Sequence, residues 1–338
     1  MIRFNCDYLE GCHPAILDKL MATNMEQHPG YGEDEYCAHA AQLIRETFCC
    51  EDAAVHFLVG GTQANTTVIA AALRPYEGVL CADTGHINTH ETGAIESSGH
   101  KCLALPHVNG LITAQQVRDA VTLQGNDEHV VKPGMVYISM STEMGTLYTK
   151  QQLQELYAAC RELELPLFID GARLGYALSA PACDITPADL ASLCDVFTVG
   201  GTKVGALFGE VVVIRNQAIN RNFRYMIKQR GGMLAKGRLL GIQFEALMEN
   251  GLYFHIAKKT VAQAIRIREK LLEKGYPLLI DSPTNQLFPI VDTETLARIE
   301  KDFAVAVWER VDAEHVAIRI CTSWATSDEN VDKLIAAL

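Results

Sequence analysis

The stretches PLFIDGARLG (residues 166–175) and DVFTVGGTK (residues 195–203) follow one plan, in which an apolar run is followed closely by glycine and a charged side chain. Such runs are typical of buried strands. Around them, similar runs alternate with segments whose apolar residues recur every three or four positions, as in helices. This alternation predicts an α/β fold with a mostly parallel sheet flanked by helices. The expected strands are 54–59, 79–82, 135–140, 167–170, 196–199 and 211–215, and the expected helices are 62–73, 114–123, 150–163 and 187–193.

The pattern changes after about residue 228, where two long helical segments lead into shorter strands and a final helix from Asp328. A length of 338 residues also suits two domains. We therefore expect a large domain over residues 1–235 and a smaller α+β domain over residues 236–338, with the first dozen residues packing on the smaller one and the chemistry between them. The later helices are expected at 236–249 and 253–273, and the later strands at 287–290, 304–308 and 316–321.

Charge and cysteine content exclude several classes of protein. The formal net charge is −12, which argues against nucleic acid or an anionic membrane surface as partner, since both need a basic face. No segment approaches the ~18 consecutive apolar residues of a membrane span, and we expect a cytoplasmic protein. The 11 cysteines are odd in number and include no Cys-x-x-Cys pair, so we expect neither a disulfide framework nor a metal site.

Ligands of open parallel sheets bind beyond the carboxyl ends of strands, and one such position here is glycine-rich. Gly60, Gly61 and Thr62 follow an expected strand and open an expected helix, where free backbone N–H groups suit a phosphate. The alternative is an ordinary strand–helix turn in which Thr62 serves as N-cap. The sequence leaves both interpretations open.

Two charged residues follow other strands of the same sheet. Asp170 ends a buried strand, where a carboxylate needs a cationic partner: either Arg173, in a structural ion pair, or a cationic ligand such as a protonated pyridine. Lys203 lies in an apolar, glycine-rich stretch, where burial favours a neutral, nucleophilic amine. The alternative for Lys203 is a surface lysine on a loop.

Pyridoxal phosphate (PLP) requires these three features together. Its phosphate needs the phosphate site, its ring nitrogen needs a carboxylate, and its aldehyde needs an amine. The motifs G-x-G-x-x-G, G-x4-G-K-[ST] and H-E-x-x-H are absent, which weakens nucleotide and zinc-peptidase interpretations.

The sequence resembles the family of PLP-dependent threonine aldolases and β-eliminating lyases, which have the fold type I aminotransferase architecture. The match spans nearly the whole chain, and DGAR with a downstream lysine in a glycine-rich loop is its most specific part. The similar segments are HPAILDKLMATNMEQHPGYGEDEY (13–36), GGTQAN (60–65), GHINTHETGAIE (85–96), LFIDGARLG (167–175), GGTK (200–203) and IRICTSWATS (318–327).

The resemblance implies roles in cofactor binding for several residues. Lys203 would form the Schiff base with PLP, Asp170 would partner the ring nitrogen, and His86 would stack on the ring near the substrate hydroxyl. Gly61, Thr62 and Thr202 would contact the phosphate, and Arg173 would also line the cofactor site. The family's phosphate-binding arginine is missing here, and Lys236 is the cation closest in sequence to its expected position.

The resemblance also implies a substrate site. Arg173 and Arg319 would bind the amino-acid carboxylate, a role suited to a planar, permanently charged guanidinium. Tyr31, from a neighbouring subunit, and Glu91 would complete the pocket, and His129 is a weaker candidate near the hydroxyl. A homodimer or homotetramer with shared active sites is implied.

The chain departs from the family pattern in several places. Cys6 replaces a common serine, Thr202 replaces the serine before the lysine, and Ser141-Thr142-Glu143 stands where many members have Asn-Thr-His. These departures bear on side-chain specificity more than on cofactor chemistry.

The reaction implied is cleavage of the Cα–Cβ bond of threonine or allo-threonine to glycine and an aldehyde, with His86 or a water that it orients as the base. One alternative is a β-eliminating lyase that gives pyruvate and ammonia. The other is a non-catalytic binding protein on the same fold.

Overall fold

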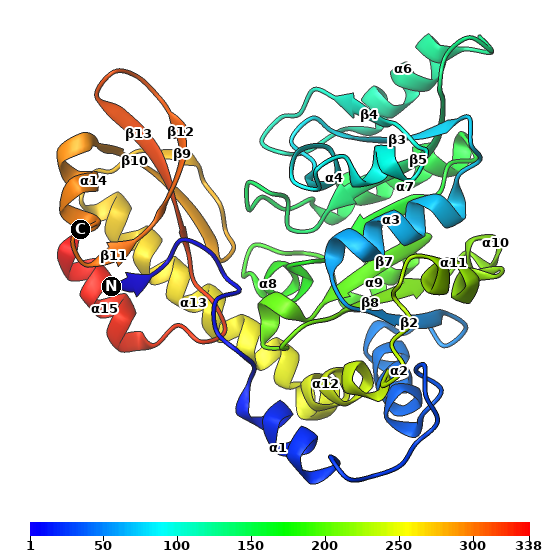
Figure 1. The fold of residues 1–338 in the computed structure, drawn as a ribbon. Helices are drawn as coiled ribbons and strands as arrows, with labels where there is room; N and C mark the ends of the chain where they lie inside the picture. The colour runs from blue at the N-terminus through cyan, green and yellow to red at the C-terminus, as the bar shows by residue number, and fades with distance from the viewer.

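The computed structural model describes residues 1–338, and its largest element is a seven-stranded sheet with strand order β2-β8-β7-β6-β5-β3-β4 (Figure 1). β8 pairs antiparallel with both of its neighbours, and every other pairing in this sheet is parallel. The predicted α/β fold with a mostly parallel sheet is therefore confirmed. The strands are β2 (Ala54–Leu58), β3 (Glu77–Ala82), β4 (Cys102–Leu105), β5 (Lys132–Ser139), β6 (Leu167–Asp170), β7 (Val196–Gly200) and β8 (Glu210–Ile214).

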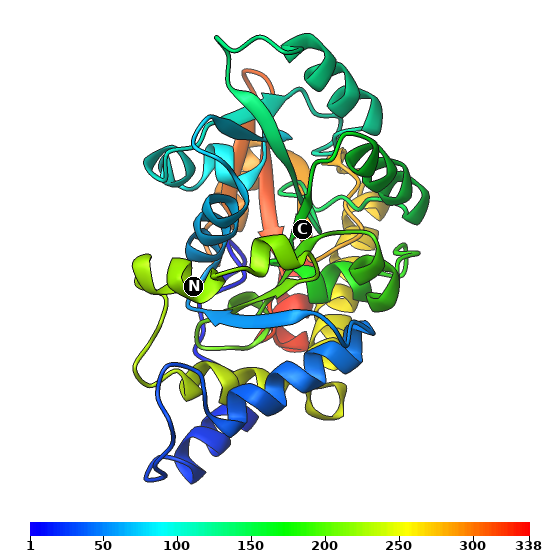
Figure 2. The same ribbon diagram turned by 90° about the vertical axis from the view of Figure 1, so that its right-hand side faces the viewer.

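Each face of this sheet packs against its own layer of helices, as Figure 2 shows from the side. In β6 the side chain of Phe168 joins one core, whereas Leu167 and Ile169 join the other, as the two-residue period of a strand requires. Both faces are apolar, which explains why the strands read as continuous apolar runs. The helices of this part are α1 (Pro14–Ala22), α2 (Glu35–Phe48), α3 (Gly61–Ala72), α4 (His86–Thr89), α5 (Ala94–Ser97), α6 (Ala114–Gln124), α7 (Lys150–Glu162), α8 (Leu174–Ser179), α9 (Pro187–Ser192), α10 (Gln217–Asn220) and α11 (Phe223–Gln229), with a 3-10 turn η1 at Thr202–Val204.

The C-terminal region forms a separate antiparallel sheet with strand order β12-β13-β10-β9. The N-terminal strand β1 (Ile2–Arg3) joins this region by pairing in parallel with β11 (Phe303–Ala304). The remaining elements are β9 (Leu278–Ile280), β10 (Gln286–Asp292), α14 (Thr293–Ile299), β12 (Ala306–Arg310), β13 (His315–Cys321) and α15 (Asp328–Ala337).

Two long helices link the two regions: α12 (Arg238–Met248) and, after the short turn η2 (Glu249–Gly251), α13 (Leu252–Glu273) (Figure 1). Tyr253 and Val261, in the first half of α13, belong to the core under the large sheet, whereas Ile267 and Leu271 belong to the core of the C-terminal region. The division expected at residue 235 stays a prediction about folding units. No helix combines the length and apolar character needed to cross a bilayer.

The differences from the expected elements have local causes. The edge strand β4 was not expected, because only Cys102 of its four residues is buried and the run carries little apolar signal. The single strand expected at 304–308 is wrong, since the chain pairs with β1 at Ala304 and begins a new pairing with β13 at Ala306.

Candidate active site

One cavity of about 350 Å³ lies at the edge of the large sheet where the parallel strands end. Its walls come from the residues that follow β2, β5, β6 and β7, and from the start of β8, which runs the opposite way and therefore begins at the same edge. The topology thus gathers residues that are far apart in sequence. The candidate residues that line this cavity are Gly61, Thr62, His86, Asp170, Arg173, Thr202 and Lys203.

Asp170 is 5% exposed and is held by three hydrogen bonds. Its Oδ2 accepts from the hydroxyl of Tyr137 at 2.6 Å and from Nδ2 of Asn65 at 2.9 Å, and its Oδ1 accepts from the backbone N–H of Ala172 at 2.9 Å. Burial acts to raise the pKa of Asp170, but these hydrogen bonds and the charge of His86 outweigh burial and lower it. The carboxylate is therefore ionised and fixed. The alternative ion pair with Arg173 is wrong, because Arg173 pairs with a different carboxylate.

Lys203 follows β7 in the turn η1, and its Nζ makes no hydrogen bond or ion pair with the chain. The ring of Tyr8 lies below it, with 5.9 Å between Nζ and the ring centroid. Burial and the positive charge of Arg173 lower the pKa of Lys203, although Asp7, Glu210 and Asp170 act in the other direction. A half-buried amine with a lowered pKa is suited to nucleophilic attack. The surface-lysine alternative is therefore wrong.

The N-terminus of α3 faces the same cavity without a side-chain cap. Its N-cap is Gly60, so the alternative in which Thr62 caps this helix is wrong. No atom lies within 4 Å of the position that a Cβ would take at Gly60 or Gly61. Open space in front of free N–H groups at the start of a 12-residue helix suits an anion. Thr202 exchanges weak hydrogen bonds with the backbone of Gly209 at 3.2 and 3.4 Å, and it lines the cavity nearby.

His86 begins α4, and its Nδ1 lies 2.8 Å from Oε1 of Glu91, which is 5% exposed. Burial acts to lower the pKa of His86, but Glu91 and Asp170 outweigh burial and raise it. The same oxygen of Glu91 accepts from Asn65, which also binds Asp170. One hydrogen-bonded network therefore joins the ring of His86 to the carboxylate of Asp170, and Glu91 acts behind the cavity wall.

The two candidate arginines differ in their partners. Arg173 makes a bidentate pair with Asp7, with Nε to Oδ2 at 2.7 Å and Nη2 to Oδ1 at 2.9 Å. Arg319, on β13, has no carboxylate partner: its Nη2 donates to the carbonyl of Asn5 at 3.1 Å, and its buried Nε donates to no group. The charge of Arg319 acts near the cavity, as its effect on His90 shows. Burial lowers the pKa of His90, and the charges of His86 and Arg319 lower that pKa further. The ring of His90 stacks on that of His86 at 5.6 Å.

Five candidate residues do not line this cavity: Glu91 and Arg319, described above, and Tyr31, Lys236 and His129. His129 lies exposed in the turn after α6, away from the cavity lining, and its role stays a prediction. Tyr31 and Lys236 lie on one surface of their own, because the backbone N–H of Tyr31 donates to the carbonyl of Ala235 at 3.2 Å. Neither lines the cavity of its own chain. Lys228 lies 4.8 Å from the ring centroid of Tyr31.

Several polar residues of the site did not emerge from the sequence. Asn65 is four residues after Gly61 and thus on the same face of α3. Asp7 directly follows Cys6, and the sequence comparison with the family singled out Cys6 but not Asp7. Glu210 is the only charged residue of a buried strand, EVVVI, and that pattern could have singled it out. The cavity also contains Tyr8, Ser139 and Glu143.

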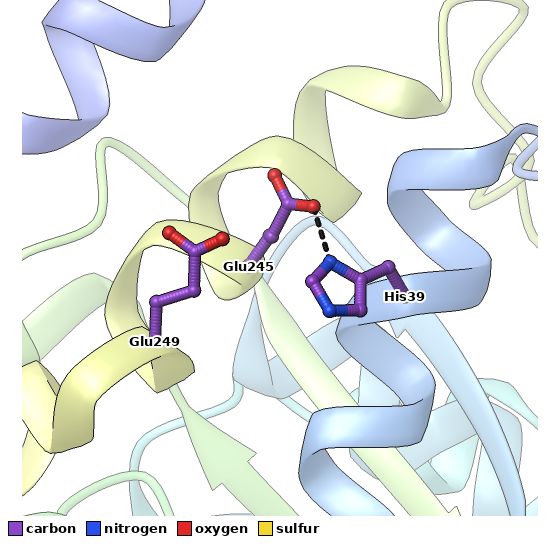
Figure 3. A group of neighbouring side chains, drawn as sticks. All are labelled: His39, Glu245 and Glu249. Atoms are coloured by element: carbon purple, nitrogen blue, oxygen red, sulfur yellow. Dashed lines mark hydrogen bonds and ion pairs between the residues drawn. The ribbon is translucent and has the colours of Figure 1, made fainter.

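A second group of titratable side chains lies between α2 and the end of α12 (Figure 3). His39, Glu245 and Glu249 each offer one ligand atom, and these atoms lie within 4.8 Å of one another. Nδ1 of His39 lies 2.6 Å from Oε1 of Glu245. However, Nζ of Lys19 lies 2.7 Å from an oxygen of each glutamate, so a cation of the chain itself already compensates their charge.

Comparison with known proteins agrees with this geometry. A family model described as beta-eliminating lyase matches residues 5–294. This chain belongs to that family. Among relatives of the beta-eliminating lyase family, the low specificity L-threonine aldolase of Pseudomonas aeruginosa is 30% identical over 342 residues, covering 98% of this chain and 95% of the relative. The enzyme of the same name from a Pseudomonas species is 34% identical over 259 residues, covering 75% of this chain and 74% of the relative.

Solved structures extend the comparison. Leishmania major threonine aldolase superposes with a TM-score of 0.98 and 45% sequence identity, covering 99% of this chain and 98% of the other. Thermus thermophilus aspartate aminotransferase superposes with a TM-score of 0.72 at 14% identity, over 100% of this chain and 90% of the other, which shows the fold alone. The aminotransferase-like fold type I architecture is therefore confirmed.

Proposed function

We propose that this protein is a PLP-dependent aldolase that cleaves the Cα–Cβ bond of threonine-type β-hydroxy-α-amino acids to glycine and an aldehyde. The observation that carries the proposal is the joint presence of Lys203, Asp170 and the N-terminus of α3 in one cavity. The names of its relatives, which are threonine aldolases, support the same reaction.

The cavity fits PLP in charge and in shape. The phosphate suits the uncapped N-terminus of α3 at Gly61 and Thr62, with Thr202 nearby. Asp170 is an ionised carboxylate for a protonated ring nitrogen, and Lys203 is an unpaired amine for the aldehyde. When bound, PLP supplies a conjugated cationic ring that accepts electrons from the bonds at Cα. Asp170 keeps the proton on the ring nitrogen, because loss of that proton would leave the carboxylate buried without a cation.

The arginines orient the substrate. Arg319 lacks a carboxylate partner within the chain, so we assign it the main contact with the substrate carboxylate. Arg173 lines the cavity with its guanidinium held in place by Asp7, and it adds positive charge at a fixed position. Together they would fix the orientation of the substrate's Cα in the cavity.

His86 holds and directs a proton at the substrate hydroxyl. Nδ1 faces the Glu91 carboxylate, and this contact raises the pKa of His86, so it stabilises the imidazolium form relative to an ordinary histidine. In that form Nε2 carries a proton and donates a hydrogen bond. His86 would thereby orient the hydroxyl, with its ring expected over the cofactor, and a separate group would accept the hydroxyl proton.

Two of the remaining candidate residues can be explained by association of subunits. Tyr31 and Lys236 share a surface outside the cavity of their own chain, so we propose that they act at the site of a neighbouring subunit in a homodimer or homotetramer. The small amino-acid substrate and the negative net charge of −12 agree with a cytoplasmic enzyme that does not bind nucleic acid or membranes.

The test is a product assay on purified protein reconstituted with PLP. Glycine and acetaldehyde released from threonine in equal amounts are the expected result. Pyruvate and ammonia released from serine, with no aldehyde from threonine, would instead establish a β-eliminating lyase. A protein that binds PLP and releases neither set of products would be a non-catalytic member of the family.

A further inference from the structure

Glu143 is a carboxyl group on the cavity wall to which the proposed function gives no role. Its Oε1 accepts hydrogen bonds from Oγ of Ser139 at 2.6 Å and from the backbone N–H of His86 at 3.0 Å. Its Oε2 has no hydrogen-bond partner within the chain and is not enclosed by it. One oxygen therefore fixes the orientation of the side chain, and the other is available to a ligand in the cavity.

The position of this free oxygen is tied to the reacting centre from two sides. Glu143 accepts a hydrogen bond from the backbone of His86, the first residue of α4. We place the ring of His86 over the cofactor, near the substrate hydroxyl. Through Ser139, Glu143 approaches the Tyr137 hydroxyl at 3.4 Å, and that hydroxyl donates to Asp170 at 2.6 Å. Glu143 thus lies at the cavity end of a polar chain that starts at the carboxylate expected beneath the ring nitrogen.

The charges around Glu143 favour proton exchange. Burial raises its pKa, and so does Asp170 on β6. The hydrogen bonds from Ser139 and from its own backbone N–H act to lower it, as does the charge of His86 on α4. Arg173, at the start of α8, is a further cation whose charge interacts with it, and Lys203 lines the same cavity. A carboxylate with a raised pKa binds a proton more strongly than an ordinary glutamate, so it is a stronger base.

The raised pKa of His86 favours the imidazolium form, which carries both ring protons and cannot accept another. Glu143 has the opposite character: its ionised form is an acceptor with one free oxygen. The two residues therefore divide the work at the hydroxyl, since one donates a hydrogen bond to the oxygen and the other accepts its proton.

We propose that Oε2 of Glu143 exchanges the proton of the substrate's β-hydroxyl group. In cleavage, the O–H bond breaks and its proton passes to Oε2, while the O–H electron pair forms the second C–O bond of the aldehyde. The Cα–Cβ bond breaks, and its electron pair stays with Cα, which then takes up one proton to become glycine. In synthesis, the protonated Glu143 returns the proton to the new hydroxyl. This assignment rests on the proposed aldolase function.

The test replaces the carboxyl group by an amide of the same shape, Glu143→Gln. The variant is expected to bind PLP with unchanged affinity and visible absorbance, because the hydrogen bonds to Oε1 can be kept. Threonine cleavage should fall by about 100-fold or more in kcat, the usual loss on removal of a general base. Exchange of the glycine α-proton with D2O, followed by NMR, should continue at nearly the wild-type rate, since that step involves no hydroxyl.

The pH profile gives an independent readout. In the wild type, kcat/KM should fall as the pH falls through the pKa of Glu143, because the base must be ionised. Glu143→Gln should lose this fall in kcat/KM at acid pH, which is the acid limb of the profile. Glu143→Asp keeps a carboxyl group, so it should retain an acid limb, although its activity is low. The matched control is Glu51→Gln, the same change at an exposed position in the turn before β2, which should leave every readout unchanged.

The outcomes separate the two proposals. Equal loss of cleavage and of glycine exchange, or an unchanged acid limb in Glu143→Gln, would overturn the assignment of Glu143 while the aldolase function stands. A wild-type holoenzyme that exchanges the glycine α-proton but releases no aldehyde from threonine would overturn the aldolase function and this assignment with it.

Discussion

Lys19 and Lys203 both lie close to several carboxylates, yet only Lys19 makes ion pairs with them. Its Nζ lies 2.7 Å from oxygens of Glu245 and Glu249, and these hydrogen bonds outweigh burial and raise its pKa. Lys203 is near Asp170 and Glu210 but makes no ion pair, and its pKa is lowered. One residue type thus serves two ends: a paired lysine joins helices, and an unpaired one keeps a reactive amine.

The same contrast separates the two arginines near the cavity. Arg173 is satisfied by Asp7 from its own chain, whereas Arg319 has one backbone acceptor and a buried Nε without a partner. Buried polar groups without partners destabilise a fold, so a water or a ligand is expected to complete them. The family resemblance implied both arginines for the substrate carboxylate, and on the basis of this pairing we propose Arg319 as the main contact.

The largest effect is expected from removing the unpaired lysine. Lys203→Ala should abolish threonine cleavage, by at least about 10⁴-fold, and should remove the adduct that borohydride reduces in the wild type. Its thermal stability should not fall, because the lost ammonium had no ion pair. Lys19→Ala is the matched control and should keep the adduct. An adduct at another lysine in Lys203→Ala, trapped by borohydride reduction and identified by peptide mapping, would contradict the assignment.

Removing the unpaired arginine should have the next largest effect. Arg319→Ala should raise KM for threonine by about 100-fold, since it removes a charge-assisted contact with the carboxylate. The visible absorbance of the bound cofactor should be unchanged. Arg310→Ala, on the neighbouring exposed strand, is the control. An unchanged KM in steady-state assays would assign carboxylate binding to Arg173 instead.

The contrast between paired and unpaired groups also explains what could be predicted from sequence. The alternation of strands and helices fixed the sheet, and glycine or charge after a strand pointed to Gly61, Asp170 and Lys203. These signals are local, so a single stretch of sequence contains them. The pairing of Arg173 with Asp7 crosses 166 positions of sequence, and no local pattern encodes it.

Other residues were missed for related reasons. In the sequence, Glu143 is visible only as part of a departure from the family pattern and Glu210 only as the charge in an apolar strand. Their place in one cavity follows from the folded chain. Tyr31 and Lys236 were expected from the resemblance, which reports a family's complete assembly. The position of each in a single chain depends on packing between segments 30–32 and 235–237, which sequence alone does not reveal.

The Asp7–Arg173 pair should produce a measurable pH dependence of stability. Burial acts to raise the pKa of Asp7, but Arg173 outweighs it and lowers the pKa from 3.8 to about 2. Because the folded pKa lies below the unfolded one, the stabilisation is fully present above pH 4 and is lost as the pH falls through about 2. The expected loss is about 2 kcal/mol in the free energy of unfolding.

Denaturant unfolding of the wild type and of Asp7→Asn between pH 6 and pH 2 measures this effect. The variant is less stable throughout, because a buried guanidinium loses its partner. Its stability should nevertheless fall less steeply between pH 4 and pH 2 than that of the wild type. Parallel curves for the two proteins in that range would show that Asp7 titrates normally in the folded state.

The smallest effect is expected from the paired lysine. Lys19→Met removes an ammonium whose side chain is 29% exposed, and it leaves Glu245 and Glu249 facing each other with only the ring of His39 beside Glu245. Partly exposed ion pairs contribute little individually, so we expect a loss of about 1 kcal/mol in denaturant unfolding, with cofactor absorbance and kcat unchanged. Lys333→Met, which breaks the exposed pair with Glu329, should cost less than half of this. If Lys19→Met instead impaired catalysis without loss of stability, pairing would no longer distinguish structural from functional lysines in this chain.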